Sequence, residues 1–355
     1  MPAGLRPRSA TVVDQLAAPA VTVVTGASGW LGRALVHRLL ADNARPRLRL
    51  LVRTTAEAHA LEVLGNVEVV IGDIAKPDTM ARLLHDTGDS ADLIHTAGII
   101  HPTATRQFFE INTNGTRHVV EAALDHGVRR LVHVSSNSPF GTNPHNGDTF
   151  RANEPYHPYY GYGQSKMQGE LAVFEAMDRG LEATIVRPPW FYGPFQPPRQ
   201  TTFFRLVRAG KFPVVGDGEQ RRSMVYVDNL VNGVIAAELT AAAKGKGYWV
   251  ADERPYTVNE IVATVGRALT DEGFSVKPPT TRLPAIAGRI AELGDRIVQG
   301  LGRYQQQLHV LGEMNHTIAC DISATRDDLG YQPRVELYEG MRRSIRWCVE
   351  QGVDL

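Results

Sequence analysis

The chain has 355 residues, of which 43% are hydrophobic and 21% are charged. This is the usage of an ordinary globular protein, and it allows a sizeable buried core in one large domain or two small ones. The 38 Lys and Arg residues balance the 38 Asp and Glu residues. The overall charge therefore predicts neither a nucleic acid nor an anionic membrane as a partner.

Cysteine usage and hydropathy narrow the class of protein further. Cys320 and Cys348 are too few for a disulfide framework and lack zinc-ligand spacing, so we expect two reduced, buried thiols. The histidines show no metal-ligand spacing, so no metal is predicted. Residues 1–20 contain no apolar signal-peptide core and are expected to form a flexible leader. No run of about eighteen apolar residues predicts a spanning helix, which leaves a cytoplasmic enzyme as the expectation.

Strand-like and helix-like segments alternate through the first half of the chain. Short apolar runs rich in β-branched residues predict strands at 21–25, 48–53, 67–71, 93–96, 131–135 and 184–187. Helical spacing predicts helices at 30–41, 108–125 and 163–177. This alternation, with strands that are almost continuously apolar, predicts an α/β fold over 21–187 with a Rossmann-type doubly wound parallel sheet.

The composition changes after residue 187. Residues 188–199 hold five prolines and predict a shaped loop. The remainder mixes helices with short strands at 223–227 and 247–250. We expect 188–355 to form mainly a smaller, substrate-binding α/β region at the carboxyl ends of the strands, with a discontinuous return to the Rossmann domain allowed.

Apolar residues recur three and four apart near the end of this region. They are Leu283, Ile286, Ile290, Leu293, Ile297 and Leu301. The period predicts an amphipathic helix, most simply one that packs its apolar side on the core. A mobile lid over the substrate and a helix at a membrane surface are the alternatives.

A glycine-rich turn follows the first predicted strand and opens a helix. Gly26, Gly29 and Gly32 have the spacing TGxxGxxG, which allows a tight turn, a close approach of the backbone to a pyrophosphate, and close packing of helix on sheet. The free N–H groups and positive dipole end of the helix would meet the phosphates. The predicted dinucleotide site also includes the residues between the glycines, namely Ser28, Trp30 and Leu31.

The end of the second strand bears on the choice of cofactor. An Asp or Glu about twenty residues after the turn would bind a ribose 2′-hydroxyl, but Leu51-Val52-Arg53-Thr54 stands there. Arg53 can pair with a 2′-phosphate, which favours NADP over NAD. The alternative is that Arg53 caps a surface strand and that NAD binds through other contacts. Asp73, after the third strand, is either an adenine contact or a plain loop residue.

Tyr162 and Lys166 stand four apart at the start of a predicted helix, so their side chains share one face. A free tyrosine has a pKa near 10. We expect the Lys166 ammonium and an oxidised nicotinamide to lower it, so that Tyr162 exchanges a proton with an alcohol or ketone. Lys166 would also bind the nicotinamide ribose. A hydroxyl at Ser135 or Ser136, after the fifth strand, can polarise the substrate carbonyl.

Together these motifs resemble the extended short-chain dehydrogenase/reductases, from about residue 21 to residue 347. The matching pieces are TGASGWLG at 25–32, GDI at 72–74, INTNGT at 111–116, VSS at 134–136, YGQSK at 162–166, RPP at 187–189, YGP at 192–194 and RSMVYVD at 222–228. The resemblance implies that Ser136 is the catalytic serine, with Ser138 as a substitute near the substrate. It implies a nicotinamide cofactor bound by further residues, namely Ile74, Thr96, Ala97, Gly98, Pro188 and Pro189. It also implies that Asn112 supports the site, and that the protein is a homodimer.

Two enzyme classes share this framework. Dehydratases of the family carry Thr-Asp-Glu after the catalytic region, but Asn137-Ser138-Pro139 follows Ser136 here, so dehydration is set aside. Epimerases commonly hold a nucleotide-sugar with an asparagine just before Tyr-Gly-Pro, where this chain has Trp190 and Phe191. These side chains favour an apolar or sterol-like substrate, as in the 3β-hydroxysteroid dehydrogenase-like branch. Arg222 stands where epimerases bind a sugar diphosphate, or it forms an internal salt bridge.

We therefore expect an oxidoreductase that prefers NADP and moves hydride between nicotinamide and a secondary alcohol or ketone, with Tyr162 as the acid and base. A nucleotide-sugar epimerase with tightly bound NAD is the alternative. A catalytically silent, NADP-sensing protein is a third hypothesis, against which the intact Ser136, Tyr162 and Lys166 argue.

Overall fold

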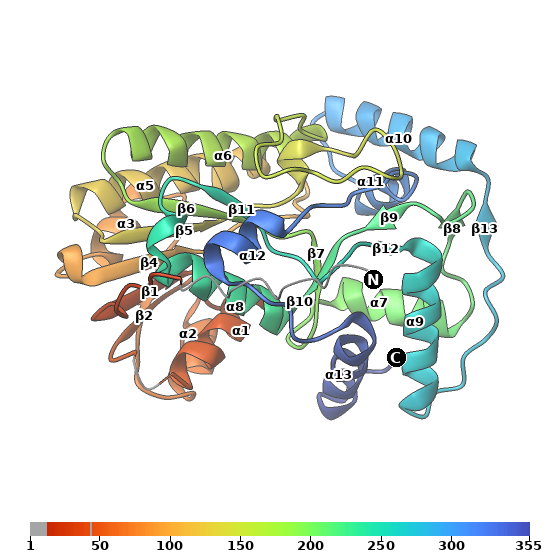
Figure 1. Ribbon diagram of the computed structural model, residues 1–355, viewed down its shortest axis with the longest axis horizontal. Helices are drawn as coiled ribbons and strands as arrows, with labels where there is room; N and C mark the ends of the chain where they lie inside the picture. Colours follow the sequence, from red (N-terminus) through yellow and green to blue (C-terminus); the bar gives the residue numbers. More distant parts are fainter. Residues whose placement is uncertain (1–12, 43–44) are drawn as a thin grey trace, which may run out of the picture.

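The computed structural model describes residues 13–42 and 45–355, and a parallel sheet of seven strands forms its centre (Figure 1). The strand order is β11-β6-β5-β4-β1-β2-β3, and every neighbouring pair is parallel. The strands are β1 (Val21–Thr25), β2 (Leu48–Val52), β3 (Val67–Ile71), β4 (Ala91–His95), β5 (Arg130–Val134), β6 (Ala183–Arg187) and β11 (Gly247–Trp249). The order reverses between β1 and β4, and ligands of such sheets bind at that point, beyond the carboxyl ends of the strands. The predicted doubly wound α/β fold is confirmed.

Helices cover both faces of this sheet (Figure 1). On one face α5 packs against α3 and α6, and on the other α1 packs against α8. The helices are α1 (Trp30–Leu40), α2 (Thr55–Glu62), α3 (Pro77–Leu83), α4 (Arg106–Phe108), α5 (Thr116–Asp125), α6 (Tyr160–Asp178), α7 (Pro198–Arg208), α8 (Val227–Leu239), α9 (Val258–Asp271), α10 (Ala285–Gly300), α11 (Gln306–Glu313), α12 (Ser323–Leu329) and α13 (Leu337–Glu350).

Burial explains why the strands are apolar along their whole length. All five residues of β1, β2, β4, β5 and β6 are buried, because helices cover the sheet on both sides. Val23 contributes to the core under α3, α5 and α6, while Val24, next to it, contributes to the core under α1 and α8. The edge strand β3 is only partly buried.

The chain returns to the sheet after residue 187. Strand β11 pairs with β6, with Tyr248 opposite Val186, and α8 packs on β5 and β6. The first part of the expected leader lies outside the described residues. Within 13–20 the Leu16 N–H donates to the Leu239 carbonyl (2.6 Å), and Arg129 donates to the Ala17 carbonyl (2.8 Å).

The smaller region is built from three short strand pairs and the helices α7, α9, α10, α11 and α13. The pairs join β7 (Trp190–Tyr192) to β10 (Met224–Tyr226), β9 (Arg221–Arg222) to β12 (Tyr256–Thr257), and β8 (Val214–Val215) to β13 (Arg282–Leu283). No helix among the described residues is long and apolar enough to cross a membrane. Cys320 and Cys348 are free and buried, as expected.

Residues 283–301 form a helix, α10, but its orientation corrects the simplest expectation for it. Ile286, Ile290, Leu293 and Ile297 are each more than half exposed, and the buried positions are Gly288, Ala291 and Asp295. Small and polar residues therefore face the protein, because α10 lies close on α11 and leaves no room for large side chains there. The apolar row faces outward.

Candidate active site

The glycine-rich turn after β1 leaves no space for side chains. A Cβ atom on Gly26, whose φ is +69°, would lie 2.7 Å from the Ala97 backbone, and one on Gly32 would lie 2.0 Å from the Gly26 carbonyl oxygen. No side chain caps the N-terminus of α1, at Gly29. A tight cradle that ends on an uncapped helix N-terminus fits the pyrophosphate of a dinucleotide.

The neighbouring residues of the turn connect it to other parts of the site. Leu31 is buried in the core. Trp30 donates to the Pro194 carbonyl (2.7 Å), and its ring centroid lies 4.4 Å from that of Phe191. The turn is thereby joined to the loop that follows β6, which carries Pro188 and Pro189. Ser28, in the same turn, is half-buried.

The loop after β4 approaches the same turn from the switch point of the sheet. Thr96 donates through Oγ1 to the Thr25 carbonyl (2.7 Å). Asn112 holds the far end of this loop: its Oδ1 accepts from the Ile99 N–H (2.8 Å), and its Nδ2 donates to the Ile99 carbonyl (2.9 Å). Gly98 lies against Asn112, where a Cβ would be 3.2 Å from Oδ1. Asn112 therefore has the supporting position that the resemblance implied.

One feature here was not predicted from the sequence. The expected single helix over 108–125 contains a π-helical segment, η2 (Phe109–Gly115), which carries Asn112. The wider turn lets Nδ2 of Asn112 reach Ser165 Oγ (3.1 Å), and Thr113 Oγ1 donates to the Ser165 carbonyl (3.0 Å). Such segments frequently mark functional sites, and this one fastens α6 to the cofactor-side loop.

Both a guanidinium and a carboxylate lie at the end of β2. Glu57 Oε2 accepts from the N–H groups of Arg53 (2.7 Å) and Thr54 (3.1 Å), in a capping box that opens α2. The exposed side chain of Arg53 lines an open hollow of about 490 Å³, together with Lys76 and Arg82. Asp73 and Asp78 line the same hollow, so three cations and two carboxylates surround it.

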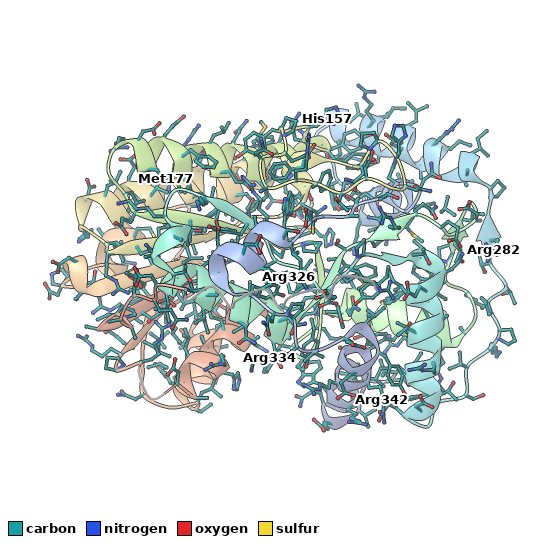
Figure 2. All side chains as sticks on the ribbon, in the orientation of Figure 1. His157, Met177, Arg282, Arg326, Arg334 and Arg342 are labelled. Atoms are coloured by element: carbon teal, nitrogen blue, oxygen red, sulfur yellow. The ribbon has the colours of Figure 1, made fainter. Side chains whose placement is uncertain are left out.

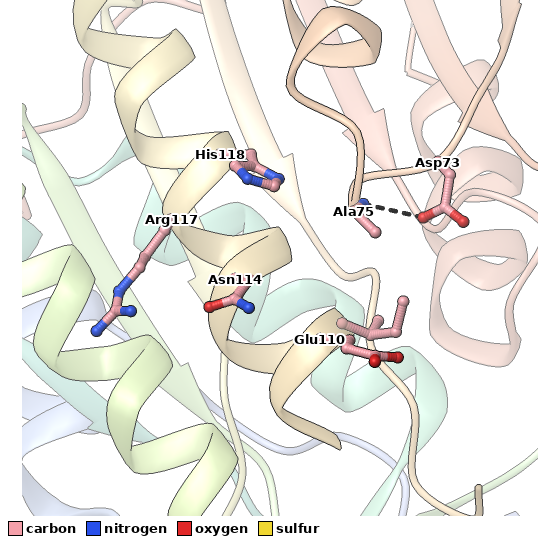
Figure 3. A pocket seen from close by; sticks show the side chains of 7 residues that line it. Asp73, Ala75, Glu110, Asn114, Arg117 and His118 are labelled. Carbon is pink, nitrogen blue, oxygen red and sulfur yellow. Dashed lines mark hydrogen bonds between the residues drawn. The ribbon is translucent and has the colours of Figure 1, made fainter. Parts of the chain in front are cut away.

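Asp73 lines this hollow and also a second one, of about 390 Å³, on its other side. Its Oδ1 accepts from the Ala75 N–H (2.9 Å), which fixes the turn after β3 (Figure 3). Glu110, Asn114 and His118 line the opposite wall of the second hollow (Figure 3). Ile74 is buried against Gly115, so it supports the loop.

Ser136 and Tyr162 come together at the carboxyl end of β5. The Ser136 hydroxyl acts to lower the pKa of Tyr162, which places the two groups close together, and Ser136 Oγ lies 3.3 Å from Ser138 Oγ. The nearest aromatic neighbour of Tyr162 is Phe108, with ring centroids 5.7 Å apart. This juxtaposition can hold a carbonyl oxygen between a donor hydroxyl and a phenol.

The pKa of Tyr162 differs from the expectation. Burial raises it above its usual value near 10, and the Ser136 hydrogen bond and the charge of Arg199 only partly oppose this. Lys166 is not a cause, because its ammonium points elsewhere: Nζ donates to the Val134 carbonyl at 2.9 Å. In this structure the phenol therefore keeps its proton at neutral pH.

Lys166 is buried close to two histidines, His95 and His133, a neighbourhood that the sequence did not reveal. Burial lowers its pKa to about 8, while Glu170, one turn further along α6, works against the shift. Burial and Lys166 together lower the pKa of His95 to about 3, and that of His133 also falls far below its usual value. Both imidazoles are therefore neutral, which leaves Lys166 as the charged group.

The two aromatic residues predicted to contact substrate lie apart from Tyr162. Trp190 Nε1 donates to Gln200 Oε1 (3.3 Å), and its ring packs edge-on against Phe203. Phe191 packs on Trp30 at the cofactor turn. Because Trp190 and Phe191 alternate along β7, they point to opposite sides, and neither ring contacts Tyr162 within the described ranges.

Arg222 is held by a contact with the main chain. Its guanidinium donates to the main-chain carbonyl of Glu313. Burial lowers its pKa, and the charge of Glu313 and the phenol of Tyr159 act in the opposite direction. The internal salt bridge is therefore not formed in the described structure, and the diphosphate role stays a prediction.

The structure adds residues that the sequence analysis missed. Arg199, at the start of α7, lies near Trp30, Tyr162 and His101, and burial lowers its pKa. It forms no ion pair among the described residues. His101 Nδ1 lies 2.9 Å from the hydroxyl of Tyr304, and burial lowers the His101 pKa to about 4. These residues come from distant loops without a recognisable motif, so spacing could not identify them.

Comparison with known proteins places the chain in a family. A model of the NAD dependent epimerase/dehydratase family matches residues 22–251. An uncharacterized protein of Sinorhizobium fredii is 47% identical, over 95% of this chain and 97% of its own. A 3beta-hydroxysteroid-dehydrogenase/decarboxylase of Arabidopsis thaliana is 30% identical, over 91% of this chain and 78% of its own. A 2-alkyl-3-oxoalkanoate reductase of Stenotrophomonas maltophilia is 27% identical, over 90% of this chain and 97% of its own.

Solved structures share the architecture. The crystal structure of gox2253 has a TM-score of 0.77 and 25% identity, covering 94% of this chain and 99% of that one. A UDP-glucuronic acid 4-epimerase from Bacillus cereus in complex with NAD has a TM-score of 0.73 and covers 93% of this chain and 99% of that one. At 21% identity, the second likeness shows the fold alone.

Proposed function

The chain belongs to the NAD-dependent epimerase/dehydratase family of extended short-chain dehydrogenase/reductases, and on that premise we propose that it reduces an apolar ketone, or oxidises the matching secondary alcohol, with NADP preferred. The observation that carries this proposal is the juxtaposition of Ser136 and Tyr162 beside the buried Lys166. A bound nicotinamide would supply or accept the hydride.

The residues of the chain would handle the proton. In the direction of reduction, Ser136 would hold the carbonyl oxygen and Tyr162 would give it a proton as hydride reaches the carbonyl carbon. The raised pKa of Tyr162 supports this direction, because the phenol keeps its proton at neutral pH. Lys166 would hold the nicotinamide ribose, and its bond to the Val134 carbonyl would keep α6 in place against β5.

The preference for NADP rests on the hollow at the end of β2. Arg53, Lys76 and Arg82 line it, and a 2′-phosphate placed there would form charge-assisted contacts. Asp73 and Asp78 also line it and would offset part of this attraction. Glu57 opposes this preference, because its carboxylate occupies the N–H groups of Arg53 and Thr54. A negative charge at that point disfavours a phosphate group. Substitutions of Arg53 and of Glu57 therefore test the proposal directly.

Arg199 bears on the class of substrate. A largely buried guanidinium without a carboxylate partner in the described structure leaves a place for an anionic group near Tyr162. One similar protein is named for 2-alkyl-3-oxoalkanoates, in which a carboxylate lies close to the ketone. We include in the proposal a carboxylate next to the reacting carbonyl, bound by Arg199.

A nucleotide-sugar epimerase that keeps NAD is the second candidate, and Arg222 favours it. Among the described residues the guanidinium bonds only a main-chain oxygen of Glu313, so its charge would be available to a diphosphate. Trp190 is 36% exposed, and this apolar surface close to the cleft suits an alkyl chain better than a sugar nucleotide.

The test is ketone-dependent oxidation of NADPH by the purified full-length protein. Long-chain 3-oxo acids, their methyl esters and 3-ketosteroids are offered as substrates, with nucleotide-sugars in a parallel epimerisation assay. The proposal predicts that NADPH and ketone are consumed in equal amounts, and that Tyr162→Phe abolishes turnover while NADPH still binds. Interconversion of nucleotide-sugars without net cofactor oxidation would establish the epimerase instead.

A further inference from the structure

The outer side of α10 carries a row of exposed apolar side chains, which we call the α10 stripe. The exposed fractions are 63% for Ile286, 64% for Ile290, 59% for Leu293, 57% for Ile297 and 75% for Leu301. Single exposed apolar side chains are ordinary on protein surfaces, but a contiguous set marks an interaction site. The stripe therefore calls for a covering partner.

The geometry of α10 makes the stripe a continuous ridge. Its members are three and four residues apart, so they lie on one side of the helix. The sixteen residues of α10 span roughly 24 Å at 1.5 Å per residue. In Figure 1 the helix lies at the margin of the molecule, over α11. A straight ridge of this kind fits a flat surface.

Arginines accompany the stripe at intervals of seven residues. Arg282, Arg289, Arg296 and Arg303 are all exposed, and none forms a salt bridge among the described residues. Arg282 stands just before the start of α10, at the margin of the molecule (Figure 2). Arg282 already donates to the Asp217 carbonyl (3.1 Å) and to Asn259 Oδ1 (3.4 Å). Arg289, Arg296 and Arg303 are therefore the cations most available to a partner that carries negative charge.

The acidic residues of α10 point away from the stripe. Asp295 is fully buried, and its Oδ2 lies 2.8 Å from His309 Nδ1. Glu292 reaches His316, with an N–O distance of 3.3 Å. The outward side of the helix thus combines apolar and cationic side chains, while its carboxylates face the protein.

We propose that the α10 stripe docks on the surface of an anionic lipid bilayer, with the helix in the plane of the interface. The apolar residues would enter the boundary of the acyl chains, and the arginines would contact lipid phosphates. A second copy of this chain fits less well. A two-fold contact through the stripe would bring the arginines of both copies together, and α10 offers no outward carboxylate to pair with them.

The neutral overall charge of the chain does not oppose this docking. Attraction to a charged surface acts within about a Debye length, roughly 8–10 Å near physiological salt. The arginines beside the stripe therefore determine the attraction to a charged surface, and the net charge of all 355 residues does not. We expected no anionic membrane as a partner because the overall charge is neutral. That expectation did not consider the arginines on the outward side of α10.

The same helix is attached to the candidate active site. The Tyr160 hydroxyl donates to the Glu292 carbonyl (3.2 Å), and the Gly161 N–H donates to Gln299 Oε1 (3.1 Å), directly before Tyr162. Tyr160 has a φ of +55°, a costly conformation for a tyrosine that these contacts help to hold. If the proposed function is right, a substrate dissolved in the bilayer would enter next to Tyr162. That consequence rests on the proposed function, whereas the docking does not.

The test is co-sedimentation of the full-length protein with vesicles, without any substrate. Vesicles of phosphatidylcholine mixed with phosphatidylglycerol are compared with pure phosphatidylcholine. We expect the protein to bind the anionic vesicles, and the double variant Ile290→Glu with Ile297→Glu to lose that binding by about tenfold or more. Arg289→Gln with Arg296→Gln should remove most of the preference for phosphatidylglycerol. The control Val63→Glu changes another exposed residue (81% exposed), at the C-terminal end of α2, and should bind like the wild type.

Binding of NADPH and the melting temperature show that each variant folds, and the substituted side chains are exposed. No binding by the wild type, or equal binding by the Ile290→Glu, Ile297→Glu variant, overturns the proposal. Light scattering adds a third outcome: a wild-type dimer that this variant dissociates would mean that a second copy covers the stripe. Because the assay needs no turnover, a failure of ketone reduction would leave its result unchanged.

Discussion

The ammonium of Lys166 donates a hydrogen bond of 2.9 Å to the carbonyl of Val134, two residues before Ser136. This contact joins α6 to the end of β5, and it sets Tyr162, one turn earlier on the same helix, against the Ser136 hydroxyl. Lys166 therefore helps to align the candidate acid with the candidate oxyanion donor, besides any contact that it makes with a cofactor.

Substitution of the two hydroxyl residues should separate chemistry from binding. Tyr162→Phe removes the proton donor and should lower kcat by about 10²–10⁴-fold. Ser136→Ala removes a donor to the carbonyl oxygen and should lower kcat by about 10²–10³-fold. Cofactor titration should give the wild-type Kd for both variants. A Tyr162→Phe protein with wild-type turnover would mean that another group supplies the proton.

The two reaction directions should respond differently to pH. Burial raises the pKa of Tyr162 above 10, so the protonated acid needed for reduction is present throughout the neutral range. Oxidation needs the tyrosinate, so its kcat/KM should rise about tenfold per pH unit below that pKa. Measuring both directions over the same pH series checks this. A flat profile for oxidation around neutral pH would indicate that bound cofactor has already ionised the phenol.

Lys166 should make stability depend on pH in the alkaline range. Its pKa is lowered to about 8 in the folded protein, against 10.5 as its ordinary value. Between these values the unfolded chain binds more protons, so the free energy of unfolding should rise with pH, at most by on the order of 1 kcal/mol per pH unit. Lys166→Met should lack this contribution. Urea titrations of both proteins across this range provide the comparison, and parallel curves would show that Lys166 is not perturbed.

Arg53 and Glu57 should act in opposite senses on cofactor choice. Arg53→Ala should weaken NADP binding by about tenfold or more, with little change for NAD, because a charge-assisted contact to the 2′-phosphate is lost. Glu57→Gln keeps the acceptor for the Arg53 and Thr54 N–H groups but removes its charge, so NADP should bind a few-fold more tightly. Calorimetric titration with both nucleotides measures this. An NADP-to-NAD ratio that Arg53→Ala leaves unchanged would refute the assignment.

Arg199 should govern the recognition of an anionic substrate. Arg199→Gln should raise KM for a long-chain 3-oxo acid by about tenfold or more, because a charge-assisted hydrogen bond is lost. The methyl ester of the same acid has no negative charge and is the matched control. Equal losses with acid and ester would point instead to a contact between Arg199 and the cofactor.

Much of this fold can be predicted from local pattern. The seven-stranded sheet follows from apolar runs such as Val21–Thr25 and from the turn whose Gly26 and Gly32 leave no room for a Cβ. We could predict from the sequence that Ser136, Tyr162 and Lys166 lie close together. The reason is that β5 and α6 are consecutive elements with a known relation in this fold. Local spacing and the order of elements carry that information.

The features that could not be predicted from the sequence depend on tertiary packing. The period of α10 is the same whether its apolar side faces core or solvent, so only its packing on α11 showed the exposed stripe. Arg199, His101 and Tyr304 meet from three separate segments, and no spacing relates them. The direction in which the pKa of Tyr162 shifts depends on where Lys166 Nζ points. A four-residue interval in the sequence does not specify this.

The central claim is that this enzyme exchanges its nicotinamide cofactor at each turnover. The most direct measurement is to denature the purified protein, identify any released nucleotide by mass spectrometry, and titrate the emptied protein with NADP and NAD. We expect the purified protein to carry no bound nucleotide, or to exchange it freely, and to bind NADP more tightly than NAD. Near-stoichiometric NAD that resists exchange would contradict it and would identify an epimerase that recycles its cofactor.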